Sequence, residues 1–192
     1  MADLSPQRAL GLLGNGGITL TTERQRAVAI RQSSAADTEL IWDMHHQLSE
    51  RTIRLRYGAP KQLYPAAFLR EQVERMMADD AGQSAALIAT VADGNHDTAV
   101  ALVQLVHDPA EPGVAEIAIL VRDDYQREGL GRALTRLMQL VARARGVREL
   151  CINALAENRA VMRLVRGFGM PYTASASRGE ITIVIPLGAG AE

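Results

Sequence analysis

The chain has 192 residues, a length that suits one domain with a sizeable core, and its 47% hydrophobic and 22% charged residues are typical of an ordinary globular protein. With 21 Lys and Arg against 22 Asp and Glu, the formal charge is −1, which gives no reason to expect nucleic acid or an acidic membrane as a partner. The single cysteine, Cys151, excludes an intrachain disulfide, and no apolar run approaches the roughly 20 residues that span a bilayer. Residues 1–6 lack the basic and apolar regions of a secretory signal, so we expect a cytoplasmic protein.

Residues 1–26 are predicted to form an extension that precedes a domain at 27–192. Four glycines between residues 11 and 17 argue against a stable helix in this extension. A short strand over 18–22 is the one regular element that we expect there. The sequence indicates no function for this segment.

The rest of the chain alternates apolar strand segments with segments of helical periodicity. We expect a first strand at 27–31, then a helix at 36–50, a mixed segment at 51–63 and a second helix that begins at Pro65. Three strands follow at 84–92, 98–106 and 115–121. The chain then continues with a helix at 130–145, a strand at 150–155, a helix at 158–166 and two final strands at 172–177 and 181–185. Turn signals at Asp93-Gly94 and Arg178-Gly179 indicate hairpins, which make antiparallel neighbours, whereas helical crossovers make parallel ones. The order predicts an α/β fold with a mixed, mostly antiparallel sheet of about seven strands and four helices.

The segment 126–132, Gln-Arg-Glu-Gly-Leu-Gly-Arg, lies between an apolar strand and a long helix and is the first candidate for a binding site. Gly129 and Gly131 let the backbone approach a ligand closely. Amides at the start of a helix lack intrahelical partners and the helix dipole adds positive potential, so the segment suits a pyrophosphate. Arg127 and Arg132 can add charge-assisted hydrogen bonds. A tight turn that packs a helix against a strand gives the same pattern, so both interpretations stand at this point.

Two motifs together resemble the GCN5-related N-acetyltransferase (GNAT) superfamily. The first is the Gln-x-x-Gly-x-Gly spacing of 126–131, which follows the strand at 116–121 as in the acyl-CoA loop of that superfamily. The second is Leu-Ala-Glu-Asn-Arg-Ala at 155–160, where Asn158 opens a helix and Met170 stands at the position of the family's closing phenylalanine. Both motifs are most similar to those of bacterial protein lysine acetyltransferase domains, which carry Glu-Phe-Ala-Val, Gly-Leu-Gly-Arg and Leu-Ala-Glu-Asn-Arg-Ala.

This resemblance implies a GNAT fold whose fourth and fifth strands splay, with acetyl-CoA as co-substrate and no metal. The pantetheine arm would fill the gap between the two strands and bond to the backbone like a missing strand neighbour. The implied donor-binding residues are Ile119, Leu120, Val121, Gln126, Arg127, Glu128, Gly129, Leu130, Gly131, Arg132, Asn153, Asn158 and Ala160. The implied reaction is N-acetylation of a primary amine, with a protein lysine favoured as acceptor. A small-molecule amine acceptor and a non-catalytic acyl-CoA-binding regulatory module are the alternatives, and a homodimer is compatible with each.

Glu116 is the candidate general base, because the resembling lysine acetyltransferases use a glutamate at this position of the strand. Strand alternation places Glu116, Ala118 and Leu120 on one face. A carboxylate in a mostly apolar strand is either an acid/base group with a raised pKa or part of a buried ion pair, with a solvated face as the third alternative. The family's tyrosine general acid falls at Val165, which cannot donate a proton. The leaving thiolate would therefore take its proton from water or from the ammonium product.

Other side chains that could carry chemistry have simpler interpretations. Cys151 lies in a predicted strand beside the thioester, but no His–carboxylate pair supports an acyl relay, so we expect a small core residue. His45 and His46 are adjacent on a helix, point apart and cannot form a metal pair. Tyr125 and Tyr172 match no catalytic position, and we expect both to pack in the interior.

Overall fold

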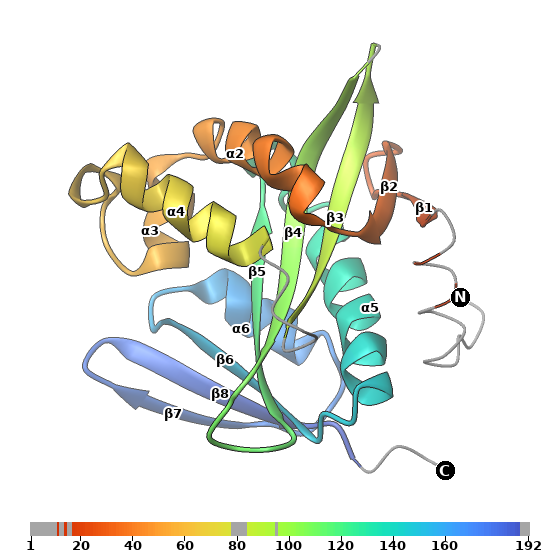
Figure 1. The fold of residues 1–192 in the computed structure, drawn as a ribbon. Coiled ribbons are helices and arrows are strands. Elements are labelled where there is room, and N and C mark those ends of the chain that lie inside the picture. The colour runs from red at the N-terminus through yellow and green to blue at the C-terminus, as the bar shows by residue number, and fades with distance from the viewer. Residues whose placement is uncertain (1–10, 12–13, 15–16, 78–83, 95, 189–192) are drawn as a thin grey trace.

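The protein is built on one twisted sheet, shown in Figure 1. The structure is a computed structural model that describes residues 11, 14, 17–77, 84–94 and 96–188. Within this part of the chain, eight strands lie side by side in the order β1-β2-β3-β4-β5-β6-β8-β7. They are β1 (Ile18–Thr21), β2 (Ala27–Gln32), β3 (Ser84–Asp93), β4 (His96–His107), β5 (Val114–Val121), β6 (Glu149–Leu155), β7 (Thr173–Ser177) and β8 (Glu180–Pro186). Only β5 and β6 are parallel neighbours, and the other pairs are antiparallel.

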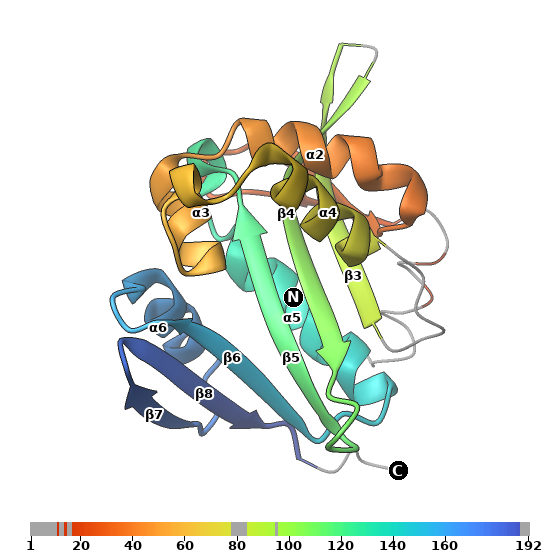
Figure 2. The same ribbon diagram turned by 60° about the vertical axis from the view of Figure 1, so that its left-hand side comes forward.

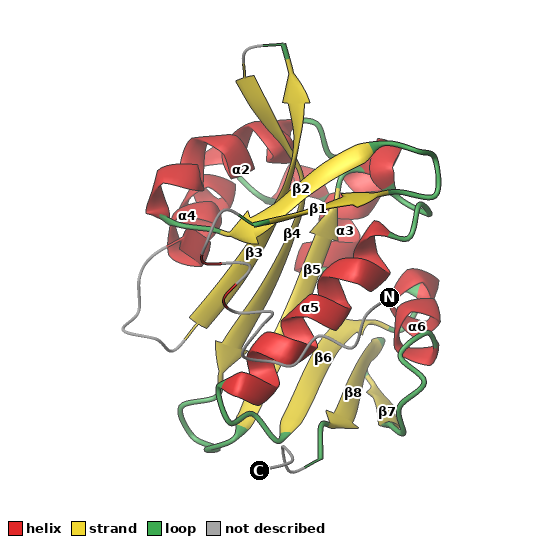
Figure 3. Ribbon diagram, turned by 90° about the vertical axis from the view of Figure 1, so that its right-hand side faces the viewer, coloured by secondary structure: helices red, strands yellow, loops and turns green. Residues whose placement is uncertain are grey.

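Helices cover both faces of the sheet, as Figure 3 shows. The α-helices of the described residues are α2 (Thr38–His46), α3 (Glu50–Tyr57), α4 (Ala66–Met77), α5 (Leu130–Ala144) and α6 (Arg159–Arg166). α5 and α6 pack on one face in a core that includes Leu134, Met138 and Val165. α2, α3 and α4 pack on the other face with Leu102 and Leu120. None of these helices is both long enough and apolar enough to cross a membrane.

The α/β prediction with a mixed, mostly antiparallel sheet is confirmed, but the sheet has eight strands rather than about seven. The additional strand is β1, which pairs with β2 in the register Ile18↔Ile30 to Thr21↔Ala27. The domain boundary predicted at residue 27 therefore lies inside a hairpin of the sheet. The remaining prediction for the extension concerns residues 1–10, 12, 13, 15 and 16, which lie outside the described residues.

Residues 33–77 contain three α-helices where the sequence predicts two. The predicted helix at 36–50 stops at His46, and Ser49 then caps α3 by accepting a hydrogen bond from the Thr52 amide at 3.2 Å. Asp123 fixes this break, since its carboxylate accepts hydrogen bonds from the Ser49 amide and hydroxyl at 2.9 and 2.7 Å. Ser49 is a local cap signal, but the sequence could not predict its partner Asp123, which lies 74 residues further along the chain.

Candidate functional site

The two parallel strands of the sheet separate after a short stretch of pairing. β5 and β6 pair only from Val114↔Glu149 to Glu116↔Cys151, although both strands continue. Figure 2 shows them diverging toward α3 and α6. The splay that the resemblance implies between the fourth and fifth domain strands is therefore present, here between β5 and β6. It leaves the edge of β5 without a strand partner beyond its first residues.

Backbone alternation decides which groups of β5 face this gap. The Arg122 amide donates to the Val100 carbonyl at 2.9 Å, so the even-numbered residues of β5 direct their backbone groups at β4. Ile119 and Val121 direct their backbone groups toward the gap, as the implied contact with the pantetheine arm requires. Leu120 differs from the prediction, because its backbone faces β4 and its side chain is buried in the core under α2, α3 and α4.

The turn between β5 and α5 adopts the conformation that the glycine spacing indicates. Arg127 and Gly129 have φ angles of +62° and +80°, and Gly129 is the residue that precedes α5. The first helical hydrogen bond of α5 is that of the Ala133 amide, which donates to the Gly129 carbonyl at 3.0 Å. The amides of residues 130–132 have no intrahelical partner, and they mark the positive end of a 15-residue helix. An anion such as a pyrophosphate fits this end of α5.

Gln126 does not present its side chain to a ligand. Its Nε2 donates to the Thr52 hydroxyl at 3.1 Å and to the Val121 carbonyl at 3.0 Å. Thr52 also donates to Asp123 at 2.7 Å. Burial alone would raise the pKa of Asp123, but hydrogen bonds from Ser49 and Thr52 hold it below its usual value. The predicted contact of Gln126 is thus restricted to its backbone, and its side chain ties the turn to α3.

Glu128, one of the implied donor-binding residues, has a buried side chain whose structural role the sequence analysis did not predict. Its side chain has 0% exposure and pairs with Arg26, whose Nε donates at 3.0 Å and whose Nη2 donates to the second oxygen. The guanidinium of Arg26 also lies 3.3 Å from the ring centroid of Tyr125. Burial would raise the pKa of Glu128, but the hydrogen bonds from Arg26 and Thr22 and the charges of Arg26 and Arg24 lower it. We call this arrangement the Arg26–Glu128 clasp, and it anchors the turn before α5 to the β1–β2 hairpin.

The second motif opens α6 as predicted. Asn158 is the N-cap, and its Oδ1 accepts a hydrogen bond from the Val161 amide at 3.3 Å. The Asn158 side chain is therefore hydrogen-bonded to the backbone of α6. Ala160, in the first turn of the helix, is exposed. Val165, at the position of the family's tyrosine, is 1% exposed and lies in the core. Met170 is partly buried against the same core.

Glu116 lies on a solvent-exposed part of the sheet, which is the third of the alternatives that the sequence left open for its carboxylate. Its carboxylate is exposed and accepts a hydrogen bond from Asn153 Nδ2 at 3.3 Å, and it forms no ion pair with any residue that the structure describes. Val106, its cross-strand partner on β4, is 45% exposed. Both residues are exposed because the helical layer of α2, α3 and α4 covers this face only as far as Leu102 and Leu120. The predicted alternation along β5 is confirmed, and among the described residues the carboxylate belongs to no buried ion pair.

The remaining candidates serve structure. Cys151 is half-buried rather than fully buried, and burial together with nearby carboxylates, Glu149 first, raises the pKa of its thiol. His45 is buried, with its Nε2 at 2.6 Å from the Tyr57 hydroxyl. Tyr125 packs in the core beneath Arg26. In the described residues, no group of three or more His, Cys, Asp and Glu side chains is arranged to hold a metal ion.

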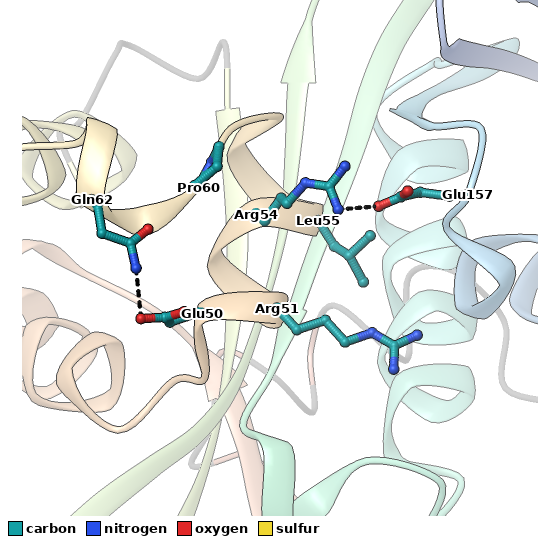
Figure 4. Close-up of a pocket in the computed structure, with 7 residues that line it drawn as sticks. All are labelled: Glu50, Arg51, Arg54, Leu55, Pro60, Gln62 and Glu157. Atoms are coloured by element: carbon teal, nitrogen blue, oxygen red, sulfur yellow. Dashed lines mark hydrogen bonds and ion pairs between the residues drawn. The ribbon is translucent and has the colours of Figure 1, made fainter.

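A surface pocket of about 220 Å³ lies between α3 and the turn before α6 (Figure 4). It is lined by Glu50, Arg51, Arg54, Leu55, Pro60, Gln62 and Glu157. The Arg54 guanidinium pairs with Glu157 at 2.8 Å and so joins α3 to the end of the gap. Gln62 donates to Glu50 at 2.7 Å. The lining has two carboxylates and two guanidinium groups, so its charge is balanced.

The two glycines of the α5 turn are expected to respond differently to alanine. At Gly129, φ is +80° and a Cβ would lie 3.0 Å from Glu23 Oε1, so Gly129→Ala should lower the free energy of unfolding by about 1–2 kcal/mol. At Gly131, a Cβ would make ordinary contacts with Ile119, Val121 and Leu164 at 3.7–4.0 Å. Gly131→Ala should therefore keep stability or raise it by up to about 1 kcal/mol. Thermal unfolding of both variants checks this, and equal melting temperatures would contradict it.

Comparison with known proteins identifies the family and the fold of this chain. The acetyltransferase (GNAT) family model matches residues 50–170, which include both motifs and Glu116. The GNAT domain of S. lividans PAT superposes with a TM-score of 0.76 at 22% identity, covering 90% of this chain and 97% of that one. The paia N-acetyltransferase from Thermoplasma acidophilum in complex with coenzyme A gives a TM-score of 0.62 at 13% identity, covering 83% and 98%. The structure of yncA from Salmonella typhimurium with its cofactor acetyl-CoA gives a TM-score of 0.61 at 17% identity, covering 86% and 96%.

Proposed function

This chain belongs to the acetyltransferase (GNAT) family, and from that premise we propose that it moves an acetyl group from acetyl-CoA to a protein lysine, with Glu116 as general base. Acetyl-CoA is its co-substrate, as for other acetyltransferases of the family. The observation that carries the proposal is the end of β5–β6 pairing at Glu116↔Cys151. A carboxylate, an unpartnered strand edge and the positive end of α5 all belong to this part of the sheet. We propose a cytoplasmic setting as well, as the sequence predicts.

The donor would be held mainly by the backbone. The pantetheine amides would bond to the groups of Ile119 and Val121 that face the gap, completing the edge of β5. The pyrophosphate would take the free amides of residues 130–132, with the exposed side chains of Arg127 and Arg132 adding charge. Backbone recognition of this kind explains why the glycine spacing matters more than the identity of the other residues in the turn.

The transfer itself requires a neutral amine. Glu116 would accept the proton of the acceptor ammonium, directly or through a water molecule, and the amine nitrogen would then attack the thioester carbonyl carbon. An amide of β5 would stabilise the oxyanion that develops. The C–S bond breaks as the C–N bond completes, and CoA leaves as a thiolate. Because Val165 cannot donate a proton, the thiolate would take one from water or from the ammonium product.

A lysine side chain suits the surface beside Glu116. Its apolar stem would pack on the exposed Val106 while its amine meets the carboxylate. The match to the S. lividans protein acetyltransferase domain agrees with this acceptor. The balanced charge of the pocket at α3 does not supply the acidic groove that would favour a peptide lysine most strongly. Its volume of about 220 Å³ would also admit a small amine, which is the alternative acceptor.

Thiol release from acetyl-CoA tests these alternatives. The purified chain would be assayed alone, with lysine-bearing proteins, and with a panel of amino acids and polyamines. We expect release to depend on added protein and acetyl-lysine to appear on that protein. Release with small amines alone would favour the alternative acceptor. Tight binding of acetyl-CoA without release in any arm would contradict an enzyme and favour a regulatory module.

A further inference from the structure

We infer that Asn153 is a positioning residue for Glu116, and that Thr182 fixes Asn153 in turn. The three side chains form a row across three strands, β5, β6 and β8. Asn153 Nδ2 donates to Glu116 Oε2 at 3.3 Å, and the Thr182 hydroxyl donates to Asn153 Oδ1 at 2.9 Å. This inference rests on the proposed role of Glu116 as the base, and it assigns the side chain of Asn153 a task besides the donor contact that the resemblance implies for this residue.

The chemistry of the three groups allows only one orientation of the amide. An ionised carboxylate can only accept hydrogen bonds, so the nitrogen of Asn153 must face Glu116. The amide oxygen then faces Thr182, whose hydroxyl can donate to it. Asn153 and Thr182 are direct cross-strand partners in the antiparallel pairing of β6 and β8, so the sheet itself maintains this contact. Each member of the row thus holds the next in a defined direction.

The row crosses the sheet where the strands begin to part. Glu116 belongs to the last residue pair between β5 and β6, and Asn153 lies two residues beyond its partner Cys151. The side-chain amide of Asn153 therefore spans the start of the gap, where the backbone pairing of β5 and β6 has ended. Leu120, on the same face, is buried beneath the helices, whereas Glu116 is exposed. Packing against the helices therefore does not hold the Glu116 carboxylate. Asn153 is the one hydrogen-bond donor to this carboxylate among the described residues.

A hydrogen-bond donor in this place should orient the base. It holds the carboxylate toward the gap, where the thioester would lie. Asn153→Ala should therefore lower kcat about tenfold. The KM for acetyl-CoA should stay within about twofold, because the backbone contacts of β5 remain.

Thr182 offers a matched pair of variants. Thr182→Val keeps the shape and strand preference of the side chain but removes the hydroxyl, whereas Thr182→Ser keeps the hydroxyl. We expect Thr182→Val to lower kcat as Asn153→Ala does, with the KM for acetyl-CoA nearly unchanged, and Thr182→Ser to keep the wild-type kcat. The double variant Asn153→Ala with Thr182→Val should be no worse than Asn153→Ala alone, since Thr182 acts through Asn153. Ser175→Ala, opposite Thr182 on β7 and outside the row, is the control.

The outcomes separate this inference from the proposed function. If Glu116→Gln is impaired while Asn153→Ala keeps the wild-type kcat, the base stands and the positioning role of Asn153 is overturned. If Glu116→Gln is fully active, the base assignment fails and the row loses its purpose. Equal kcat values for Thr182→Val and Thr182→Ser would overturn the role of the hydroxyl. Melting temperatures measured beside the kinetics distinguish misfolded variants from mispositioned ones.

Discussion

Glu116→Gln is expected to lower kcat for acetyl transfer by about 10²–10⁴-fold while acetyl-CoA still binds. Glutamine has the size of glutamate and can accept a hydrogen bond, but it cannot take the proton of the acceptor ammonium. The donor contacts lie elsewhere, on the backbone of β5 and on the first turn of α5, so they survive the substitution. A loss in kcat with a nearly constant dissociation constant for acetyl-CoA is therefore the pattern to expect.

Steady-state kinetics from pH 6 to 9, with calorimetric titration of acetyl-CoA, measure both quantities. Glu149→Gln is the matched control, because Glu149 is also an exposed strand glutamate and pairs with Val114 at the start of the β5–β6 ladder. It should keep the wild-type rate. A Glu116→Gln variant that turns over at the wild-type rate across this range would rule out Glu116 as the base.

The second large effect concerns stability. Arg26→Met should lower the free energy of unfolding by about 3 kcal/mol, because it leaves the fully buried carboxylate of Glu128 without its main partner. Methionine retains most of the apolar length of arginine, so the loss reports on charge and hydrogen bonds rather than on packing. Arg24, 3.6 Å from the same carboxylate and 66% exposed, compensates only in part.

Denaturant unfolding of three variants measures this contribution. Arg24→Met removes an exposed partner and should cost less than about 1 kcal/mol. Arg26→Met combined with Glu128→Gln should regain part of the loss, since the uncompensated charge is then gone. Similar losses for Arg26→Met and Arg24→Met would show that the Arg26–Glu128 clasp contributes no more than a surface ion pair.

The same clasp predicts how stability depends on pH. The pKa of Glu128 is lowered in the folded protein, so the carboxylate binds fewer protons there than in the unfolded chain. Its contribution to stability is therefore complete above the ordinary glutamate pKa of about 4.3 and is lost as pH falls through the lowered value. The stability difference between wild type and Arg26→Met should be largest near pH 7 and should narrow below about pH 4. A difference that grows on acidification would contradict this assignment.

How far the sequence predicts the molecule depends on how local each signal is. The turn at 126–132 and the cap at Asn158 could be predicted, because the glycine spacing and the asparagine lie beside the backbone that they shape. Arg26 could not be assigned to Glu128, since the two are 102 residues apart and belong to different elements. Likewise, the hydrogen bonds of Asp123 divide the predicted helix at 36–50 from a distance of 74 residues.

The environment of Glu116 illustrates a second limit. Alternation along β5 assigns its side chain to the correct face, because that rule needs only the strand itself. Whether that face is covered depends on how far α2, α3 and α4 extend over the sheet, and they stop near Leu120. A strand of apolar sequence can therefore carry an exposed carboxylate. Its exposure at the end of the β5–β6 pairing suits a group that must exchange protons with a substrate.

The row of Glu116, Asn153 and Thr182 also has a consequence for folding of the enzyme. Its members are 37 and 29 residues apart, and the last of them lies in β8 (Glu180–Pro186). The contact of Thr182 with Asn153 can form only when β8 pairs with β6. The proposed base would lack this support in a chain whose β8 is not yet paired. Full activity would thus depend on the strand of the row that comes last in the chain, and a partly folded chain would be a slower enzyme.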